Sequence, residues 1–307
     1  MIYGNVNNLN LSADQQNYLA TTGSDDVKCT LAKNPIIVKA VQELLVEDDT
    51  KIRKALACNP ALCAEYIDEL MDDTSTDVII SLAGNSALTN EMQMQIATNY
   101  SKDIPILQSL AQNPNLSAEL MKKFISSDSY DSYDNEVKAG LASNRSLPEA
   151  MQAKLIKFAK ESRNVEKIKI NLASNPVLKI AQQAELAQDR SVDVRVALYN
   201  NPSLDMSVKK RVISSFSQLD IDFAKRDLER NEDRRREASE EIQKCSLKSW
   251  DISGGFYFSE SSRQSAADSN RSSWEYAEKK ERDARHEIKR LEITLRVLKE
   301  ALAQQVS

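Results

Sequence analysis

The heptapeptide Leu110-Ala111-Gln112-Asn113-Pro114-Asn115-Leu116 is one of seven copies of a motif, Leu-Ala-x-Asn-Pro-x-Leu, that decides the fold of this 307-residue chain. Every copy keeps the asparagine, and successive asparagines lie 25 to 31 residues apart. A period in this range is typical of a stacked array, in which each repeat buries its apolar surface against its neighbours. The asparagines of the other copies are Asn34, Asn59, Asn85, Asn144, Asn175 and Asn201.

The motif predicts two short helices joined by a sharp turn in each repeat. Leu and Ala end the first helix and face the core. Asn tolerates the left-handed conformation expected just past a helix end, and Pro stops the helix. The next Leu returns to the core and a second helix begins, as the capping-box sequence at 146–149 (Ser-Leu-Pro-Glu) indicates.

Composition favours an all-α fold, because glycine (6 residues) and aromatic residues (6%) are rare. The N-terminus has no signal-peptide pattern, and no apolar run is long enough to span a membrane. The four cysteines are scattered and fit neither a disulfide framework nor a metal site. We therefore expect a cytoplasmic protein with no metal and no cofactor. These cysteines are Cys29, Cys58, Cys63 and Cys245.

The chain divides into two predicted domains. Residues 1–217 form the repeat domain, in which 1–25 are a degenerate opening repeat that serves as an N-terminal cap. Residues 218–307 show apolar residues at alternating spacings of three and four, which is typical of a coiled-coil seam. A Ser-rich loop at 248–272 separates two such helices, so we expect an antiparallel helical hairpin with this loop at its tip.

The repeat unit resembles that of the leucine-rich repeat variant family, which is similar to the HEAT and armadillo solenoids. The resemblance covers residues 8–217, and residues 193–204 show the unit from its Asp through Val-Arg to the final Leu. It implies a right-handed α-solenoid of about seven to eight repeats, and it implies no catalytic residues. Some members carry an iron–sulfur cluster on a Cys-rich segment, which this sequence lacks.

The seam pattern also suggests a register for the hairpin. If Ile242 lies near Trp274, then Arg235 meets Glu281 inside the seam. Such an ion pair adds little stability but can fix the register. Parallel self-association of either helix is the competing arrangement.

Two loops are candidate partner contacts. The tip loop carries Trp250, Phe256, Tyr257 and Phe258, and the insertion at 126–135 carries Tyr130 and Tyr133. Aromatic side chains of this kind are rigid anchors for a partner. The alternatives are that the tip aromatics pack on the coiled coil or on the solenoid, and that the insertion is merely solvated.

Charge is distributed unevenly along the repeats. Residues 1–149 hold 11 Lys and Arg against 21 Asp and Glu, whereas residues 150–217 hold 12 against 6. The basic end is either an ordinary solvated surface, a site for an acidic partner or nucleic acid, or a head-to-tail contact between molecules. Its densest part is the basic patch of Lys154, Lys157, Lys160, Arg163, Lys167 and Lys169.

No nucleophile–base constellation or nucleotide-binding motif occurs, and the single histidine, His286, falls on a charged coiled-coil helix. We therefore expect a non-enzymatic scaffold or adaptor that binds protein partners and has the capacity to self-associate through its coiled coil. The alternative is a nucleic-acid-binding protein that uses the basic end of the solenoid. Overall acidity, with a net charge of −5, counts against this alternative.

Overall fold

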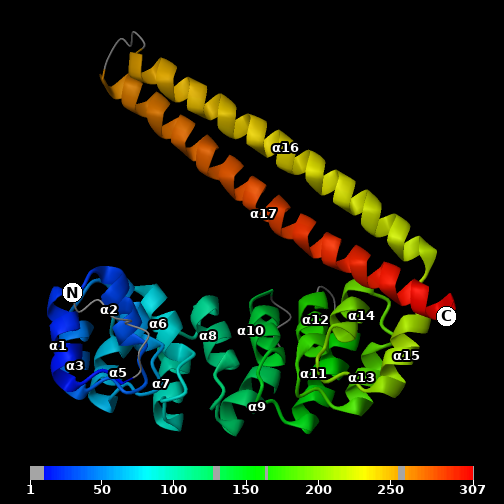
Figure 1. The fold of residues 1–307 in the computed structure, drawn as a ribbon, viewed down its shortest axis with the longest axis horizontal. Coiled ribbons are helices and arrows are strands. Elements are labelled where there is room, and N and C mark those ends of the chain that lie inside the picture. The colour runs from blue at the N-terminus through cyan, green and yellow to red at the C-terminus, as the bar shows by residue number, and fades with distance from the viewer. Residues whose placement is uncertain (1–9, 127–131, 163–164, 255–259, 307) are drawn as a thin grey trace. The chain divides into compact units, whose positions relative to one another are not determined.

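The computed structural model describes residues 10–126, 132–162, 165–254 and 260–306 (Figure 1). All regular elements in these ranges are α-helices, as predicted. The chain forms two compact units, residues 1–186 with 200–205 and residues 187–199 with 206–307.

The first unit is a solenoid of two helical layers. Helices of the first layer pack side by side in chain order, and several neighbours in the second layer do the same. The first layer contains α2 (Asp25–Ala32), α4 (Thr50–Ala57), α6 (Thr76–Ala83), α8 (Ile104–Gln112), α10 (Ser132–Ala142) and α12 (Glu166–Ser174). The second layer contains α1 (Ala13–Thr22), α3 (Lys39–Val46), α5 (Ala64–Met71), α7 (Asn90–Asn99), α9 (Ala118–Ser126), α11 (Glu149–Glu161) and α13 (Ile180–Leu186).

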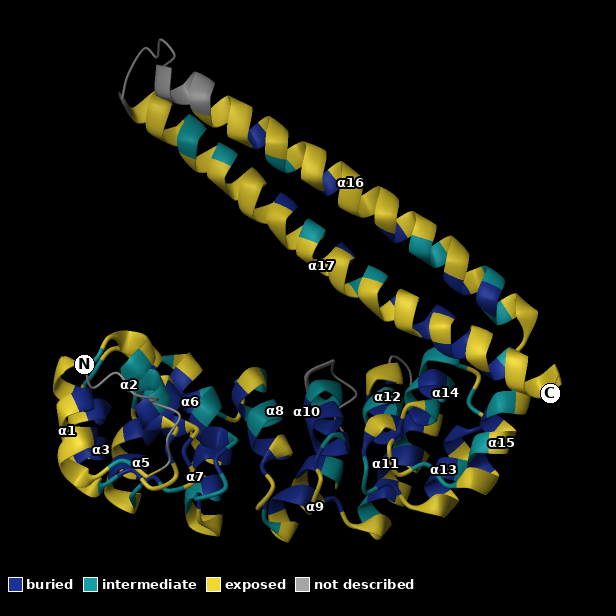
Figure 2. Cartoon of the chain, in the orientation of Figure 1, coloured by how far each residue is buried: buried dark blue, intermediate teal, exposed yellow. Residues whose placement is uncertain are grey.

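The core lies between the layers and is built from the repeated motif (Figure 2). The Leu and Ala that end each first-layer helix are fully buried, for example Leu110 and Ala111. The Leu after each turn is also buried, as at Leu116. Each repeat therefore contributes the same small set of apolar side chains to one continuous core.

The turn itself differs from the sequence expectation. Asn113 has φ −56° and ψ 124°, and Asn175 has φ −75° and ψ 120°, so neither asparagine is left-handed. The reason is the following proline, whose ring forces the preceding residue into an extended conformation. The turn closes when Leu116 N–H donates to Asn113 O at 3.0 Å, and Asn115 N–H donates to Asn113 Oδ1 at 2.9 Å.

Two turns lack proline but keep these bonds. Ser86 and Arg145 occupy the proline position after Asn85 and Asn144. Ala87 N–H still donates to Asn85 Oδ1 at 2.8 Å, and Ser146 N–H donates to Asn144 Oδ1 at 2.7 Å. The asparagine, rather than the proline, therefore defines the turn.

The asparagine side chains also join each repeat to the one before it. Asn113 Nδ2 donates to Ala83 O at 3.0 Å and to Asn85 O at 2.6 Å, both in the preceding turn. Asn59, Asn85, Asn144, Asn175 and Asn201 make the same pair of bonds. All are buried, so each bond satisfies a carbonyl that water cannot reach. We call this series the asparagine ladder.

A second set of side chains reaches in the opposite direction. Gln93 Nε2 donates to Asn115 O at 2.9 Å in the next turn, and Gln93 Oε1 accepts from Ser117 N–H at 2.9 Å. Gln16, Gln42, Gln152 and Gln183 act in the same way. The sequence analysis missed these residues, although each lies five positions after the Leu or Ile that follows the turn. The other three repeats replace the glutamine by Ile67, Met121 and Lys209.

A basic residue six positions before the asparagine forms a third inter-helix contact at the turns of Asn34 and Asn59. Arg53 Nε donates to Asp73 Oδ2 at 2.7 Å, and Lys28 Nζ donates to Asp48 Oδ2 at 2.7 Å. Burial opposes ionisation of Asp73, but hydrogen bonds from the Arg53 guanidinium and from Ser75 N–H outweigh it and lower the pKa of Asp73. These pairs fasten a first-layer helix to the end of the following second-layer helix.

The second unit contains the two helices of the last repeat and two long helices. Its helices are α14 (Val192–Tyr199), α15 (Met206–Ser214), α16 (Gln218–Gly254) and α17 (Glu260–Val306). The compact units therefore group α14 and α15 with the hairpin rather than with the other repeats. Helix also covers most of the predicted tip loop at 248–272, and only residues 255–259 lie between α16 and α17. The Ser-rich composition of this stretch was a misleading loop signal, because Ala, Arg and Gln residues interleave with the serines.

Replacing Asn113 by Ala tests the asparagine ladder. It removes two donated bonds and one accepted bond in a buried turn, and we expect the free energy of unfolding in urea to fall by about 3 kcal/mol. Asn34→Ala is the matched control, because Asn34 accepts the turn bond but its Nδ2 has no partner in the described part of the chain. The control should lose only about 1 kcal/mol. Equal losses at both positions would contradict the ladder.

The Arg53–Asp73 pair predicts a pH dependence. Because the pKa of Asp73 is lower in the folded state, its stabilising contribution is complete above the unfolded value of about 3.9 and is lost as pH falls through the folded value. Urea unfolding at a series of pH values should show a weaker acid dependence below about pH 4 for Asp73→Asn than for wild type. The exposed Asp68→Asn variant serves as control, and an unchanged profile for Asp73→Asn would refute the pair's role.

Candidate protein-binding surface

The hairpin α16–α17 is held by a seam of mostly small residues. Buried positions on α16 recur every seven residues, and buried positions on α17 do so too, as expected for a coiled coil. The α16 set is Ala224, Asn231, Ala238 and Cys245, and the α17 set is Ala277, Ala284, Leu291 and Leu298. Alanine at these positions leaves room for a close approach of the two helices.

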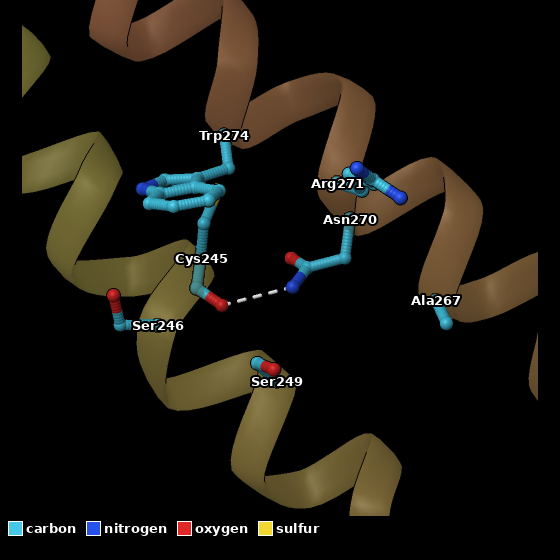
Figure 3. Close-up of a pocket in the computed structure, with 7 residues that line it drawn as sticks. All are labelled: Cys245, Ser246, Ser249, Ala267, Asn270, Arg271 and Trp274. Atoms are coloured by element: carbon cyan, nitrogen blue, oxygen red, sulfur yellow. Dashed lines mark hydrogen bonds between the residues drawn. The ribbon is translucent and has the colours of Figure 1, made fainter. Parts of the chain in front are cut away.

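The register of the hairpin differs from the expected one by about one helical turn, because Trp274 lies beside Cys245, three residues beyond the expected Ile242 (Figure 3). Ala238 and Ala284 line the same groove, and Glu241 Oε2 lies 4.0 Å from Lys280 Nζ. Trp274 shares a hollow with Ser249 rather than with Ile242. Alternating spacings of three and four fit nearly as well after a shift of about one turn, so spacing alone could not select the register.

The predicted seam pair between Arg235 and Glu281 is not formed in the structure. Glu281 accepts from Arg285 of its own helix at 2.6 Å. Arg235 is exposed and lines a groove with Ile288 and Lys289. Among the described residues, no ion pair joins the two predicted partners.

The root of the hairpin, where α16 begins and α17 ends, is bonded to the two helices of the last repeat, α14 and α15. Gln305 Nε2, near the end of α17, donates to Phe216 O at 3.1 Å and also bonds Ile213 O. Arg290 of α17 pairs with Asp193 of α14. Arg195 Nη1 of α14 donates to Ser215 O at 2.7 Å, and its Nη2 lies 3.5 Å from Asp220 Oδ1 of α16. Bonds of both hairpin helices to α14 and α15 thus set the direction in which the hairpin leaves this pair.

The seam is underfilled toward the tip, and a hollow results there (Figure 3). Asn270 and Trp274 reach from α17 toward Cys245 of α16, and Asn270 Nδ2 donates to Cys245 O at 2.9 Å. Asn270 Oδ1 is buried without a hydrogen-bond partner. The remaining lining residues are Ser246, Ser249, Ala267 and Arg271. We call this site the tip hollow.

Large apolar side chains surround this end of the hairpin. Leu247 is 63% exposed, Tyr276 is 58% exposed and Trp274 is 41% exposed. Sequence reasoning used Trp274 only as a seam residue and did not single out Leu247 or Tyr276. A signal was present in the sequence, because each is a large apolar residue in an otherwise polar stretch.

The aromatic residues that the sequence analysis proposed as contacts cannot be placed. Phe256, Tyr257, Phe258 and Tyr130 lie outside the described residues. Trp250 falls on α16 and Tyr133 on α10, but their side chains also lie outside the described part. These six contacts therefore stay predictions.

The basic patch is divided between the two layers of the solenoid. Its members Lys154, Lys157 and Lys160 lie on α11, whereas Lys167 and Lys169 lie on α12. Lys160 pairs with Glu185, and Lys167 Nζ lies 2.5 Å from Glu136 Oε2. Arg163 lies outside the described residues. Two of the predicted cations thus act in links between neighbouring repeats.

The described residues contain no group of three or more potential metal ligands. No helix among them is long and apolar enough to cross a membrane. Comparisons with protein-family models, with curated proteins and with solved structures found no match to this chain. The resemblance to the leucine-rich repeat variant family therefore stays a prediction.

Overpacking tests the small-residue seam. We expect Ala238→Leu to destabilise the hairpin by about 1–3 kcal/mol, because a buried methyl group is replaced by a branched side chain where α17 approaches. The neighbouring Ser239→Leu is exposed and should change stability by less than about 0.5 kcal/mol. Thermal unfolding followed by circular dichroism measures both. A larger loss of stability for Ser239→Leu than for Ala238→Leu would contradict the assignment of Ala238 to the seam.

Proposed function

We propose that the chain is a non-enzymatic, cytoplasmic protein-binding scaffold, in which the hairpin α16–α17 is the main partner-binding arm. The proposal rests on the tip hollow, which the exposed side chain of Trp274 lines. The root of the same hairpin is bonded to α14 and α15. An exposed aromatic beside an unfilled space is the composition of a binding hot spot. The solenoid surface is a second area for partners.

Two further observations support a scaffold. The asparagine and glutamine side chains of the repeats are consumed by bonds between turns, so the repeated residues have an architectural role. The four cysteines are free thiols, in keeping with a reducing compartment. The side chains that vary between repeats, and those on the arm, are therefore available to bind partners.

The alternative of nucleic-acid binding gains less support. A phosphate backbone needs several unpaired cations on one surface. Among the described members of the basic patch, only Lys154 and Lys157 are exposed without an ion pair, and both lie on α11. Steep salt dependence of binding would nevertheless be the mark of that activity.

Shortening the arm tests the proposal. Replacement of residues 239–283 by a short Gly-Ser loop removes the tip but keeps the facing Ala238 and Ala284 and the root contacts. We expect proteins captured from the native host by the full chain to be lost with this variant. Trp274→Ala should weaken the same capture by about 10-fold or more, since aromatic anchors contribute over 1 kcal/mol each.

The matched control is Lys154→Glu with Lys157→Glu, assayed with and without nuclease. Protein capture should be unaffected by this double change. Retention of all partners by the shortened arm would contradict the proposal. Loss of nuclease-sensitive binding with the lysine variant would instead favour the nucleic-acid alternative.

A further inference from the structure

Only one of the two rows of seam residues in the arm is covered along its whole length. A two-helix coiled coil buries both rows of its 3–4 pattern, because each side chain inserts between residues of the facing helix. In the arm, the row that contains Ala238 and Ala284 is buried. The alternate row is buried near the root, at Ile221 and Leu295, but is half-buried or exposed farther along the hairpin. Its incompletely covered members are Leu228, Arg235, Ile242 and Ser249 on α16 and Trp274, Glu281 and Ile288 on α17.

The incompletely covered row marks one face of the arm, which we call the open face. The tip hollow contains Trp274, and a groove of about 660 Å³ nearer the root contains Arg235 and Ile288. Trp274 and Ile288 are fourteen residues apart, which is two heptads, and Leu228 and Ile242 have the same spacing. Apolar side chains at heptad spacing form the surface on which a further amphipathic helix packs.

Charge divides the open face into three blocks. The residues that border the row lie one and four positions after its members, and their side chains are exposed where they are charged. They are acidic toward the tip, basic in the middle and acidic again toward the root. The tip block is Glu275 and Glu278, the middle block, with Arg235 of the row itself, is Arg235, Arg236, Arg282, Arg285 and Lys289, and the root block is Glu229, Glu232 and Glu292.

Most cations of the middle block are available to a partner. Arg285 pairs with Glu281, and Arg236 pairs with Asp233, each within its own helix. Exposed pairs of this kind are weak and exchange readily with solvent. The cations of the block that make no ion pair among the described residues are Arg235, Arg282 and Lys289.

We infer that the open face binds an amphipathic helix of a partner protein, with apolar residues at spacings of three and four and with acidic residues at its centre. This inference rests on the proposed binding role of the arm. The apolar residues of such a helix cover Trp274 and Ile288, which supplies the attraction. Its central carboxylates lie among the cations of the middle block, which sets its register on the arm.

Neither the opposite face nor a second open face offers the same complementarity. The groove on the opposite face contains only Ala238 and Ala284 as apolar residues, and its charged residues are mainly acidic. Two open faces placed together in antiparallel order set one basic middle block against another, which is repulsive. The charge pattern therefore favours a different protein with an acidic helix.

Two designed peptides test the inference. Both are three-heptad amphipathic helices with the same apolar seam. The acidic-centre peptide carries Glu beside the seam in its central heptad and Lys in its outer heptads, and the basic-centre peptide has Glu and Lys exchanged. Fluorescence anisotropy with the full chain should show binding of the acidic-centre peptide at least about 10-fold tighter than that of the basic-centre peptide.

Arg282→Glu with Lys289→Glu should remove this preference, because both cations border the open face. Arg234→Glu with Lys244→Glu is the matched control, since it changes the net charge equally at exposed positions on another side of α16, and it should keep the wild-type preference. Circular dichroism melts confirm that each variant is folded.

Equal binding of the two peptides by wild type, binding of neither, or the same loss in both variants would overturn the inference. So would a wild-type dimer in sedimentation velocity that Arg282→Glu with Lys289→Glu dissociates, because the face would then belong to a second copy. If neither peptide binds while the shortened arm still loses captured host proteins, the helix is excluded and the scaffold proposal stands. If the acidic-centre peptide is preferred while the shortened arm keeps every captured protein, the scaffold proposal fails and the open face remains a helix-binding site.

Discussion

The double hydrogen bond from each buried asparagine to the preceding turn is the interaction on which the solenoid depends. Asn113 Nδ2 donates one hydrogen bond to Ala83 O, at the end of α6, and a second to Asn85 O in the turn that follows α6. It closes its own turn with Oδ1. A buried turn without these bonds would leave carbonyl groups unpaired, which is more costly than losing an exposed hydrogen bond. No shorter or apolar side chain offers two donors and an acceptor at this point.

This constraint explains why the repeats tolerate change elsewhere. Proline can be replaced, repeat length can vary from 25 to 31 residues, and the glutamine can be replaced by Ile67, Met121 or Lys209. The asparagine bonds persist in each case. The second unit follows a different principle. There, Arg195 occupies the position of Arg53, but its guanidinium bonds Ser215 O beside the start of α16, so a contact used between helices of a repeat now fixes the hairpin.

The sequence was sufficient to predict the repeats, because a motif that recurs seven times buries its shared apolar residues when the copies stack. It was insufficient for the conformation of the asparagines, where the restriction imposed by Pro114 and Pro176 overrides the usual helix-end preference. It also could not place Arg235, because alternating spacings of three and four fit nearly as well after a shift of about one helical turn. The tip hollow was not foreseen, since it arises where Ser249, Ala267 and Asn270 leave the seam underfilled.

Hydrogen exchange of the asparagine side-chain amides, followed by NMR, tests the ladder most directly. The account predicts slow exchange for the Nδ2 protons of Asn59, Asn85, Asn113, Asn144, Asn175 and Asn201, and faster exchange for those of Asn34, whose amide makes no such bond in the described part of the chain. Exchange of all seven at the rate of exposed amides would contradict the claim that these side chains hold the repeats together.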